Sequence, residues 1–513
     1  MRKLYRIVFS RYFLSGALIF LDVVLLSLLI AYASVYSYIV AGVALLLTVA
    51  ILFDIINRET APEYKIPWLI TVLILPVMGA VIYLLFSRRK LTKGEMRRMN
   101  AVAGALSVYR NGDEPFLALK EESPAAAGKA ASLLGDDILA EVYRGTASRV
   151  FSQGEEMLNE MMFDLKSATR YIFLEYFIIA PGKIWDEIHR ILLNKVRAGL
   201  DVRLIYDDIG CMTTLPAHFD RELNAEGIRC LRFATVTPRV TVSHNNRDHR
   251  KICIIDGRIA YTGGVNLADE YANLKERFGH WKDGGIRLEG DAVAGLLKSF
   301  ITIWDVTAQK TSDYAAIFSR PDEEEPVAAD GGYYIPFGSG PSPFYPRSVG
   351  KSAFRSIIDQ AQAYVYITTP YLLVDYDLTE SICGAARRGV DVRIITPSIP
   401  DKKLIKVLTK SSYAHLIASG VRISEYLPGF IHEKTLVSDG EYAVIGTLNF
   451  DYRSFVHHFE NAVWMFRTGA IRGIRAGFLE TERLCRRISS EEAKLSRPER
   501  WICNALRLFQ PLL

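Results

Sequence analysis

The sequence predicts an α/β protein made of two similar halves that follow an apolar N-terminal segment. Three observations support this prediction: a sparse polar motif occurs twice, the strand and helix patterns around it repeat in the same order, and the first part of the chain is strongly apolar. Strands that alternate with helices are typical of parallel α/β sheets. We therefore expect one parallel sheet in each half, with the halves related by a pseudo-twofold axis.

The composition is unlike that of an ordinary soluble protein. The chain has 513 residues, of which 50% are hydrophobic, and its mean hydropathy is +0.12. This length exceeds one ordinary core, and this apolarity predicts that part of the chain lies in lipid. The net charge of +5 argues only weakly for an acidic partner. The six cysteines have neither C-x-x-C spacing nor the density of a disulfide scaffold, so we interpret them as reduced thiols, mostly in the core.

Residues 1–99 are predicted to be a membrane anchor with two to three transmembrane helices. Apolar runs at about 13–33, 38–56 and 66–86 approach the ~20 residues that a helix needs to cross a bilayer. A cleaved signal peptide is the alternative for the first run, but this run is long and lacks a small-residue cleavage pattern. Asp22 is costly inside lipid, which leaves an interfacial or re-entrant first segment open.

Basic residues at the edges of these apolar runs indicate on which side of the membrane the catalytic region lies. The positive-inside rule places basic clusters in the cytoplasm, and a dense cluster at 88–98 follows the third run. A second basic group precedes the first run, and three crossings cannot place both groups on one side. The denser cluster favours a cell-membrane protein with its catalytic region in the cytoplasm.

The rest of the chain separates into four segments. Residues 100–130 show little apolar periodicity and are interpreted as a linker, and the acidic, Gly- and Pro-rich residues 311–345 as a surface connection. The two halves are expected at 131–310 and 346–513. Each half contains an apolar strand, a helical pattern and then a G-x-D-V-R turn that leads into a second apolar strand.

The repeated motif is H-x-K-x4-D-x6-G-G/T-x-N. Its polar members are His249, Lys251, Asp256 and Asn266 in the first half and His432, Lys434, Asp439 and Asn449 in the second. A histidine and a lysine two positions apart in a strand point to the same face. Two such sets supply the nucleophile, the acid for the leaving oxygen and the fixed positive charge that metal-free phosphoryl transfer requires. The sequence therefore predicts an enzyme that acts on phosphodiesters.

The motif aspartates, Asp256 and Asp439, complete the predicted catalytic set. A structural role in a turn is the alternative for both residues. Asp256 and Asp439 each precede a glycine, which is a hairpin pattern and favours a turn-forming role over direct catalysis. The glycines near Asn266 and Asn449 let the backbone approach a phosphate, and the two amide side chains are expected to donate hydrogen bonds to it.

We expect no metal, no cofactor and no nucleic-acid partner. Zinc also uses histidine ligands, but no third ligand lies at a compact spacing such as H-E-x-x-H, and the paired lysines repel a cation. His280, His457 and His458 are interpreted as ordinary core or surface residues. A nuclease is disfavoured because no basic stripe interleaved with aromatic residues is present.

At these residues the chain resembles the phospholipase D superfamily and, within it, the bacterial cardiolipin synthases with two HKD motifs. The resemblance extends beyond the motifs to Gly263-Gly264-Val265-Asn266, Thr369-Pro370-Tyr371 and Arg453-Ser454-Phe455. The segment that contains Trp68 and Tyr83 is also similar to the membrane anchor of this family.

The resemblance implies that a phosphatidyl group passes from one phosphatidylglycerol to another through a phosphohistidine, giving cardiolipin and glycerol. It implies His249 as the nucleophile and His432 as the general acid and then the base, with the motif lysines and asparagines on the phosphoryl oxygens. It also implies that Asp283 and Glu460 orient the imidazoles, although the glycines after Asp283 depart from the family pattern and make that residue the weaker candidate.

Two alternatives stay open at this point. Water or another lipid as acceptor would make the protein a phospholipase D hydrolase or another phosphatidyltransferase, because pocket shape and water exclusion choose the acceptor. A noncatalytic membrane scaffold is the alternative from another class, and the intact His and Lys of both motifs argue against it.

Overall fold

The chain divides into two compact units, and each is considered by itself. The computed structural model describes residues 20, 21, 23–25, 27, 35–58, 62–86, 93–235, 246–319 and 327–507. The smaller unit comprises residues 1–89, 236–245 and 504–513, and the larger unit comprises residues 90–235 and 246–503. Both copies of the motif lie in the larger unit.

The described helices of the smaller unit are α3 (Val35–Asn57), α4 (Pro62–Ile74) and α5 (Pro76–Phe86). The run 66–86, expected to form one helix, forms two, because Pro76 has no N–H to continue the helix and begins α5 instead. α4 and α5 pack on each other through the edge-to-face rings of Trp68 and Tyr83, whose centroids are 5.5 Å apart. No helix within the described ranges combines the length and apolarity of a membrane crossing, and the expected run 13–33 lies largely outside those ranges.

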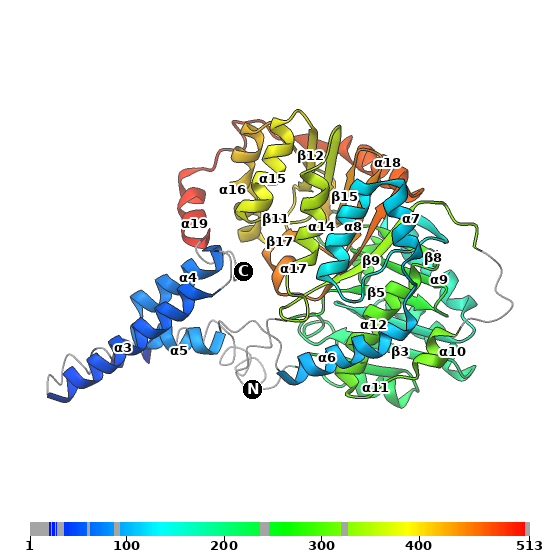
Figure 1. Cartoon of the computed structure of the whole chain (residues 1–513), viewed down its shortest axis with the longest axis horizontal. Coiled ribbons are helices and arrows are strands. Elements are labelled where there is room, and N and C mark those ends of the chain that lie inside the picture. Colours follow the sequence, from blue (N-terminus) through cyan, green and yellow to red (C-terminus); the bar gives the residue numbers. More distant parts are fainter. Residues whose placement is uncertain are drawn as a thin grey trace. The chain divides into compact units, whose positions relative to one another are not determined.

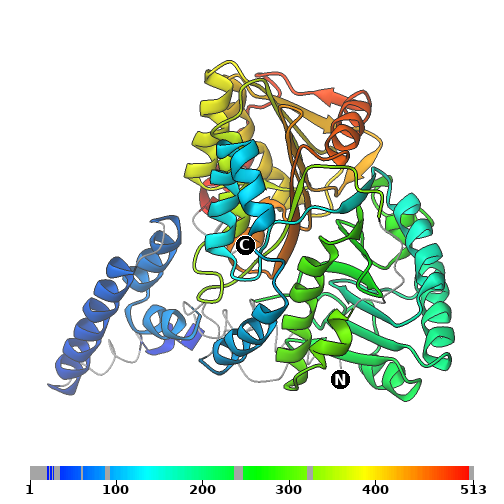
Figure 2. The same ribbon diagram turned by 45° about the vertical axis from the view of Figure 1, so that its right-hand side comes forward.

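The first half of the larger unit contains a seven-stranded sheet with the order β1-β8-β6-β5-β2-β3-β4. Its strands are β1 (Thr146–Phe151), β2 (Tyr171–Tyr176), β3 (Asp201–Asp207), β4 (Arg229–Phe233), β5 (Lys251–Ile255), β6 (Ile259–Gly263) and β8 (Gly285–Gly290). The helices of this half are α9 (Gly154–Ser167), α10 (Lys183–Arg197), α11 (Phe219–Ala225) and α12 (Val293–Ala308). Figure 2 shows them on both sides of the sheet.

The second half contains an eight-stranded sheet with the order β9-β18-β16-β15-β10-β12-β13-β19. Its strands are β9 (Tyr333–Ser339), β10 (Tyr364–Thr368), β12 (Asp391–Pro397), β13 (Arg422–Tyr426), β15 (Thr435–Ser438), β16 (Tyr442–Gly446), β18 (Glu460–Phe466) and β19 (Cys485–Arg487). The helices that follow or flank them are α14 (Val349–Ile358), α15 (Tyr376–Arg387), α16 (Lys403–Ala418), α17 (Tyr452–Val456) and α18 (Ala470–Glu482). The last described helix, α19 (Arg497–Arg507), includes residues of both units. The first seven strands match the order of the first sheet one by one, so the two-sheet α/β fold and its internal repeat are confirmed (Figure 1).

The sheets are mixed rather than parallel, which corrects the expectation of parallel sheets. β2, β3 and β4 are parallel, as are β10, β12 and β13, whereas the motif strands pair antiparallel. The reason is local: each motif aspartate and the glycine after it adopt positive φ, at +57° and +71° for Asp256 and Gly257 and at +56° and +73° for Asp439 and Gly440. Two such residues in succession form the tight turn of a β-hairpin, so each motif strand returns beside itself.

The segment 100–130, expected to be a linker, is helical. It contributes to α6 (Lys93–Leu106), α7 (Glu114–Glu122) and α8 (Pro124–Asp136). Its alanines favour helix, and α8 begins with the Ser123 hydroxyl accepting from the backbone N–H of Ala126 and with proline at the first helical position. Because α6 and α8 pack on α12 and α14, these helices join the core of both halves.

The acidic part of the predicted connection 311–345, residues 320–326, lies outside the described residues, whereas the described part contains regular structure. It includes the short helix α13 (Tyr314–Phe318) and β9, which completes the second sheet beside β18. One apolar core runs through both halves, with α12 packed on the first sheet and on β9, and a second lies mostly within the first half. All six cysteines are free, and five of them are buried, as predicted.

Candidate active site

The two motifs meet where the halves join. His249 precedes β5, and its backbone N–H donates to the Phe459 carbonyl of the second half at 2.9 Å. His432 precedes β15, and its backbone N–H donates to the Lys282 carbonyl of the first half at 2.7 Å. Two short parallel strands, β7 (His280–Lys282) and β14 (Gly429–Ile431), pair across the same junction. Residues far apart in the sequence are thus held at one place by main-chain bonds.

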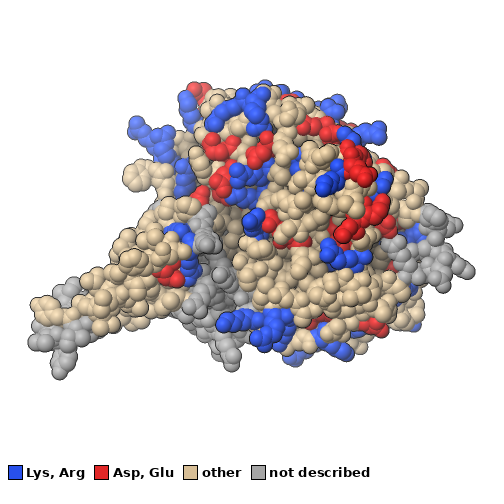
Figure 3. Space-filling view, viewed as in Figure 1, with Lys and Arg blue, Asp and Glu red and all other residues tan. Residues whose placement is uncertain are grey.

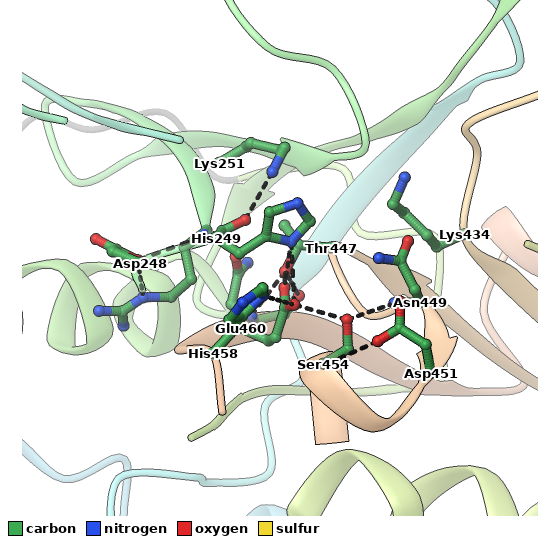
Figure 4. Close-up of polar contacts among 12 residues, drawn as sticks. Asp248, His249, Lys251, Lys434, Thr447, Asn449, Asp451, Ser454, His458 and Glu460 are labelled. Atoms are coloured by element: carbon green, nitrogen blue, oxygen red, sulfur yellow. Dashed lines mark hydrogen bonds and ion pairs between the residues drawn. The ribbon is translucent and has the colours of Figure 1, made fainter. Parts of the chain in front are cut away.

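Each histidine is held by a carboxylate from the opposite half. The Nδ1 of His249 lies 2.9 Å from Glu460, and the Nδ1 of His432 lies 2.6 Å from Asp283. An ionised carboxylate only accepts hydrogen bonds, so each Nδ1 carries the proton and each Nε2 keeps its lone pair. Figure 4 shows Glu460 beneath the ring of His249. The site therefore requires both halves to be folded together.

The two carboxylates are supported differently. The hydroxyls of Thr447 and Ser454 both donate to Glu460, the latter at 2.8 Å. Asp283 receives the backbone N–H of Gly284 at 2.9 Å, and a side chain on Gly264 would overlap its carboxylate. This accounts for the one variable motif position, where the first half has glycine and the second has threonine.

The motif lysines lie beside the histidines and are fully buried. Lys251 donates to the backbone carbonyl of His249 at 2.7 Å, and Lys434 donates to that of His432. Burial lowers the pKa of Lys251 to about 7 and that of Lys434 to about 8. Two buried lysines beside the imidazoles favour an anionic ligand, which stabilises their charged form.

The imidazoles are held neutral. Burial lowers the pKa of His432 to about 4, with the charge of Lys434 acting in the same direction and Asp283 opposing it. Burial and then the charges of Lys251 and Lys434 lower the pKa of His249 well below its usual range. A neutral imidazole with its Nδ1–H bound to a carboxylate is a nucleophile at Nε2.

The two motif asparagines differ in their available hydrogen bonds. The Asn266 amide donates to the Tyr271 hydroxyl at 2.7 Å, and its oxygen accepts from the Ile178 N–H at 3.0 Å. In the second half, Asn449 lies near Lys434 (Figure 4), and its buried oxygen has no hydrogen-bond partner among the residues described. Asn449 thus has unused capacity for a ligand, whereas Asn266 has bonds within the protein.

The motif aspartates lie at the far ends of their strands from the lysines. Asp256 accepts the backbone N–H groups of Thr169, Arg170 and Tyr171 at 2.7, 2.8 and 2.9 Å. Asp439 accepts three equivalent N–H groups, those of residues 362–364, each at 2.9 Å. We therefore assign both carboxylates to the sheet and its turn rather than to the reaction, which was the favoured alternative.

One histidine interpreted as ordinary lies beside the site. The Nδ1 of His458 is 3.8 Å from Glu460, and its ring centroid is 5.6 Å from that of His249. Within the described ranges, two sets of side chains have donor atoms close enough to share a metal ion: His249 with His458 and Glu460, and Glu380 with Cys383 and His415. The first set contains His249, one of the two motif imidazoles.

The sequence reasoning missed two features of this site, the hydroxyls of Thr447 and Ser454 on Glu460 and the exchange of carboxylates between halves. The glycine-to-threonine difference between the motifs was the available signal for the first. The exchange depends on how the halves face each other, which has no local signature.

Paired buried imidazoles, each with its carboxylate and lysine, on two equivalent α/β sheets define a phospholipase D-like enzyme that acts on phosphodiesters. Comparison with known proteins narrows the class. Residues 161–277 and 354–481 match the family model for the cardiolipin synthase, PLD-like domain, and residues 46–88 match the model for the phospholipase D-nuclease N-terminal segment.

Full-length relatives agree with these matches. A cardiolipin synthase of Halalkalibacterium halodurans is 30% identical over 96% of this chain and 99% of its own length, and one of Geobacillus kaustophilus is 32% identical over 91% of each. An uncharacterized protein of Streptococcus mutans is 38% identical over 90% of this chain and 98% of its own. The chain belongs to the cardiolipin synthase family. The crystal structure of phosphatidylserine synthase from Haemophilus influenzae shares the fold, with a TM-score of 0.56 and 13% identity over 71% of this chain and 95% of that one.

Proposed function

We propose that this protein makes cardiolipin by transferring a phosphatidyl group from one phosphatidylglycerol to another. The observation that carries the proposal is the pair of neutral imidazoles, each held by a carboxylate of the opposite half, with two buried lysines beside them. Family membership over nearly the whole chain supports the same reaction.

In the first half-reaction, the Nε2 of His249 attacks the phosphorus of the donor. An N–P bond forms, the P–O bond to the glycerol headgroup breaks, and the Nε2–H of His432 protonates the leaving oxygen. His432 must gain this proton beforehand. The negative charge of the bound phosphodiester raises the pKa of His432, which favours the charged form when substrate is present.

In the second half-reaction, a hydroxyl of the second phosphatidylglycerol attacks the phosphohistidine. His432 Nε2 takes the hydroxyl proton, a new P–O bond forms, and the N–P bond to His249 breaks. Cardiolipin leaves, and the enzyme has returned to its starting protonation. Lys251, Lys434 and Asn449 would bind the phosphoryl oxygens, and Asp283 and Glu460 would stabilise each imidazolium as it forms.

We assign His249 as the nucleophile and His432 as the acid and then the base, in line with the family resemblance. Burial lowers the pKa of both imidazoles, and each ring is held by one carboxylate, Glu460 for His249 and Asp283 for His432. Despite its burial, the contact with His432 and then the charge of Lys434 keep the pKa of Asp283 below its usual value. An ionised carboxylate beside the imidazole that exchanges protons stabilises its charged form.

We further propose that the N-terminal segment anchors the protein in the cell membrane, in more than one pass, with the larger unit in the cytoplasm. Large apolar side chains of α3 are exposed, including Val43, Leu46 and Phe53 at 61%, 71% and 63%. Exposed apolar surface of this extent is typical of a membrane-facing segment. Fractionation of membranes at alkaline pH tests the anchor: the protein stays in the pellet if it is integral and is released if it is peripheral.

The reaction is tested by incubating the purified protein with phosphatidylglycerol alone. Release of glycerol in equal amount to a doubly phosphorylated, four-chain product supports the proposal. Formation of phosphatidic acid in place of that product would show that water is the acceptor and would contradict it. His249→Ala protein serves as the control for contaminating activity.

A further inference from the structure

A small pocket lies beside the second motif and has no role in the chemistry described above. Its lining residues are Pro370, Tyr371, Pro397, Pro400, Asp401, Lys402, Ile405, Lys406, Thr409 and Phe430. Phe430 connects the pocket to the site, because its ring centroid is 5.8 Å from that of His432. The free volume of about 10 Å³ is close to the room that one water molecule needs, so the pocket admits one small polar group.

The floor of this pocket has an unsatisfied acceptor. One carboxylate oxygen of Asp401 accepts from the Tyr371 hydroxyl at 2.6 Å. The other oxygen, Oδ1, is buried and has no hydrogen-bond partner among the residues that the structure describes. A buried carboxylate oxygen is stable when a donor reaches it, and an O–H group of a ligand is a donor of the right size.

The pocket is also lined by Lys402, for which the described residues supply no carboxylate within ion-pair distance, although its charge acts on Asp451. Lys402 is exposed, and its Nζ lies 5.7 Å from the centre of the Tyr371 ring. The neighbouring Lys406, by contrast, is bonded to Glu425 and to the Pro397 carbonyl at 2.5 Å each. Figure 3 shows Lys and Arg side chains on the surface over α15 and α16. Lys402 is the residue immediately before α16 in the sequence.

Lys402 also lies within electrostatic reach of the catalytic pair. Burial lowers the pKa of His249 most, followed by the charges of Lys251, Lys434 and His432, and the charge of Lys402 acts in the same direction. Because Lys402 lines the pocket that Phe430 connects to His432, its ammonium can bind a second anionic group of a molecule that reacts at this site.

We infer that Asp401 and Lys402 form the subsite for the acceptor lipid: Asp401 Oδ1 accepts a hydrogen bond from a glycerol hydroxyl, and the Lys402 ammonium binds the acceptor's own phosphate. The inference rests on the proposed function and deepens it. Glycerol that leaves the donor carries a hydroxyl but no phosphate, whereas the acceptor carries both. Asp401 therefore serves both half-reactions, and Lys402 serves only the second.

This asymmetry provides the test. Exchange of radiolabelled glycerol into phosphatidylglycerol uses glycerol as the acceptor and needs no second phosphate, whereas cardiolipin formation needs one. Lys402→Gln is expected to raise the KM for phosphatidylglycerol in cardiolipin formation by about 10- to 100-fold, the effect of losing one bond to a charged group, and to leave glycerol exchange within about twofold.

Lys403→Gln is the matched control, because Lys403 is the exposed neighbour with the same charge and does not line the pocket. Asp401→Asn, checked by thermal unfolding, is expected to weaken both reactions. Cardiolipin formation by Lys402→Gln at the rate of Lys403→Gln, or an equal loss in both reactions, would overturn the subsite alone. Absence of cardiolipin from the unchanged protein would reject the proposed function and the subsite with it.

Discussion

The two half-sites hold equivalent imidazoles by different means. In one, the short carboxylate of Asp283 reaches His432 through space that Gly264 leaves open. In the other, the longer Glu460 reaches His249 and is fixed by the hydroxyls of Thr447 and Ser454. The internal repeat thus preserves the topology and the crossing of carboxylates between halves, whereas the contacts that support each carboxylate differ.

This divergence matches the division of labour that we propose. Glu460 accepts hydrogen bonds from two hydroxyls, which restrict its movement during proton transfer, and its partner His249 is the proposed nucleophile. The carboxylate bonded to one backbone N–H holds the histidine that must gain and lose a proton in each cycle.

Removing either motif imidazole abolishes the reaction. His249→Ala and His432→Ala are each expected to lower kcat by at least ~10⁴-fold with phosphatidylglycerol, because nucleophile and acid act as a unit. His458→Ala is the matched control, since this imidazole is adjacent but has no assigned step, and it is expected to change kcat less than about tenfold. Comparable losses of kcat in all three variants would contradict the assignment of His249 and His432 as the two catalytic histidines.

Substitutions beside the two carboxylates are expected to lower kcat to different extents in the two half-sites. Gly264→Ala places a methyl group against Asp283 and displaces it from His432, so kcat is expected to fall by about 10²- to 10³-fold. Thr447→Ala removes one of two hydroxyls from Glu460 and is expected to cost only about tenfold. Steady-state kinetics with matched thermal-unfolding curves measures both. Equal effects would mean that the half-sites are energetically alike.

The buried lysines predict loss of activity at alkaline pH. A lysine with a lowered pKa loses its charge as the pH rises through that value, which is about 7 for Lys251 and about 8 for Lys434. We expect log kcat/KM to fall with a slope of about −1 above pH ~7, where Lys251 titrates, and with a slope of about −2 above pH ~8, where Lys434 also titrates, because kcat/KM reports the free enzyme. A profile that stays flat to pH ~10 would contradict a charged-lysine requirement.

The motif aspartates are expected to affect stability rather than rate. Asp439→Ala leaves three backbone N–H groups before β10 without their acceptor, and Asp256→Ala does the same before β2. Each change is expected to lower the free energy of unfolding by about 1–3 kcal/mol. Chemical denaturation measures this, and kcat per folded enzyme stays within about threefold. A large fall in kcat without a change in stability would return these residues to the catalytic set.

The features of the fold that depend on local sequence patterns could be predicted from the sequence. The repeat predicts two equivalent sheets, and the Asp-Gly pairs predict the turns of two hairpins; both agree with the structure. The motif strands begin later than predicted, because His249, His432 and Lys434 precede them. The helices at 100–130 and the mixed strand directions were missed, because helix in an alanine-rich polar segment and strand direction depend on tertiary packing. The pairing of Glu460 with His249 joins residues of different halves, so no local spacing contains it.

The most direct test of the proposed roles uses a phosphatidyl ester of p-nitrophenol, whose leaving group departs without protonation. If His249 is the nucleophile and His432 the acid, His432→Ala still releases one equivalent of nitrophenol per enzyme in a rapid burst and accumulates phosphohistidine at position 249. His249→Ala then gives no burst. A burst from His249→Ala, with the phosphoryl group on His432, would contradict the assignment.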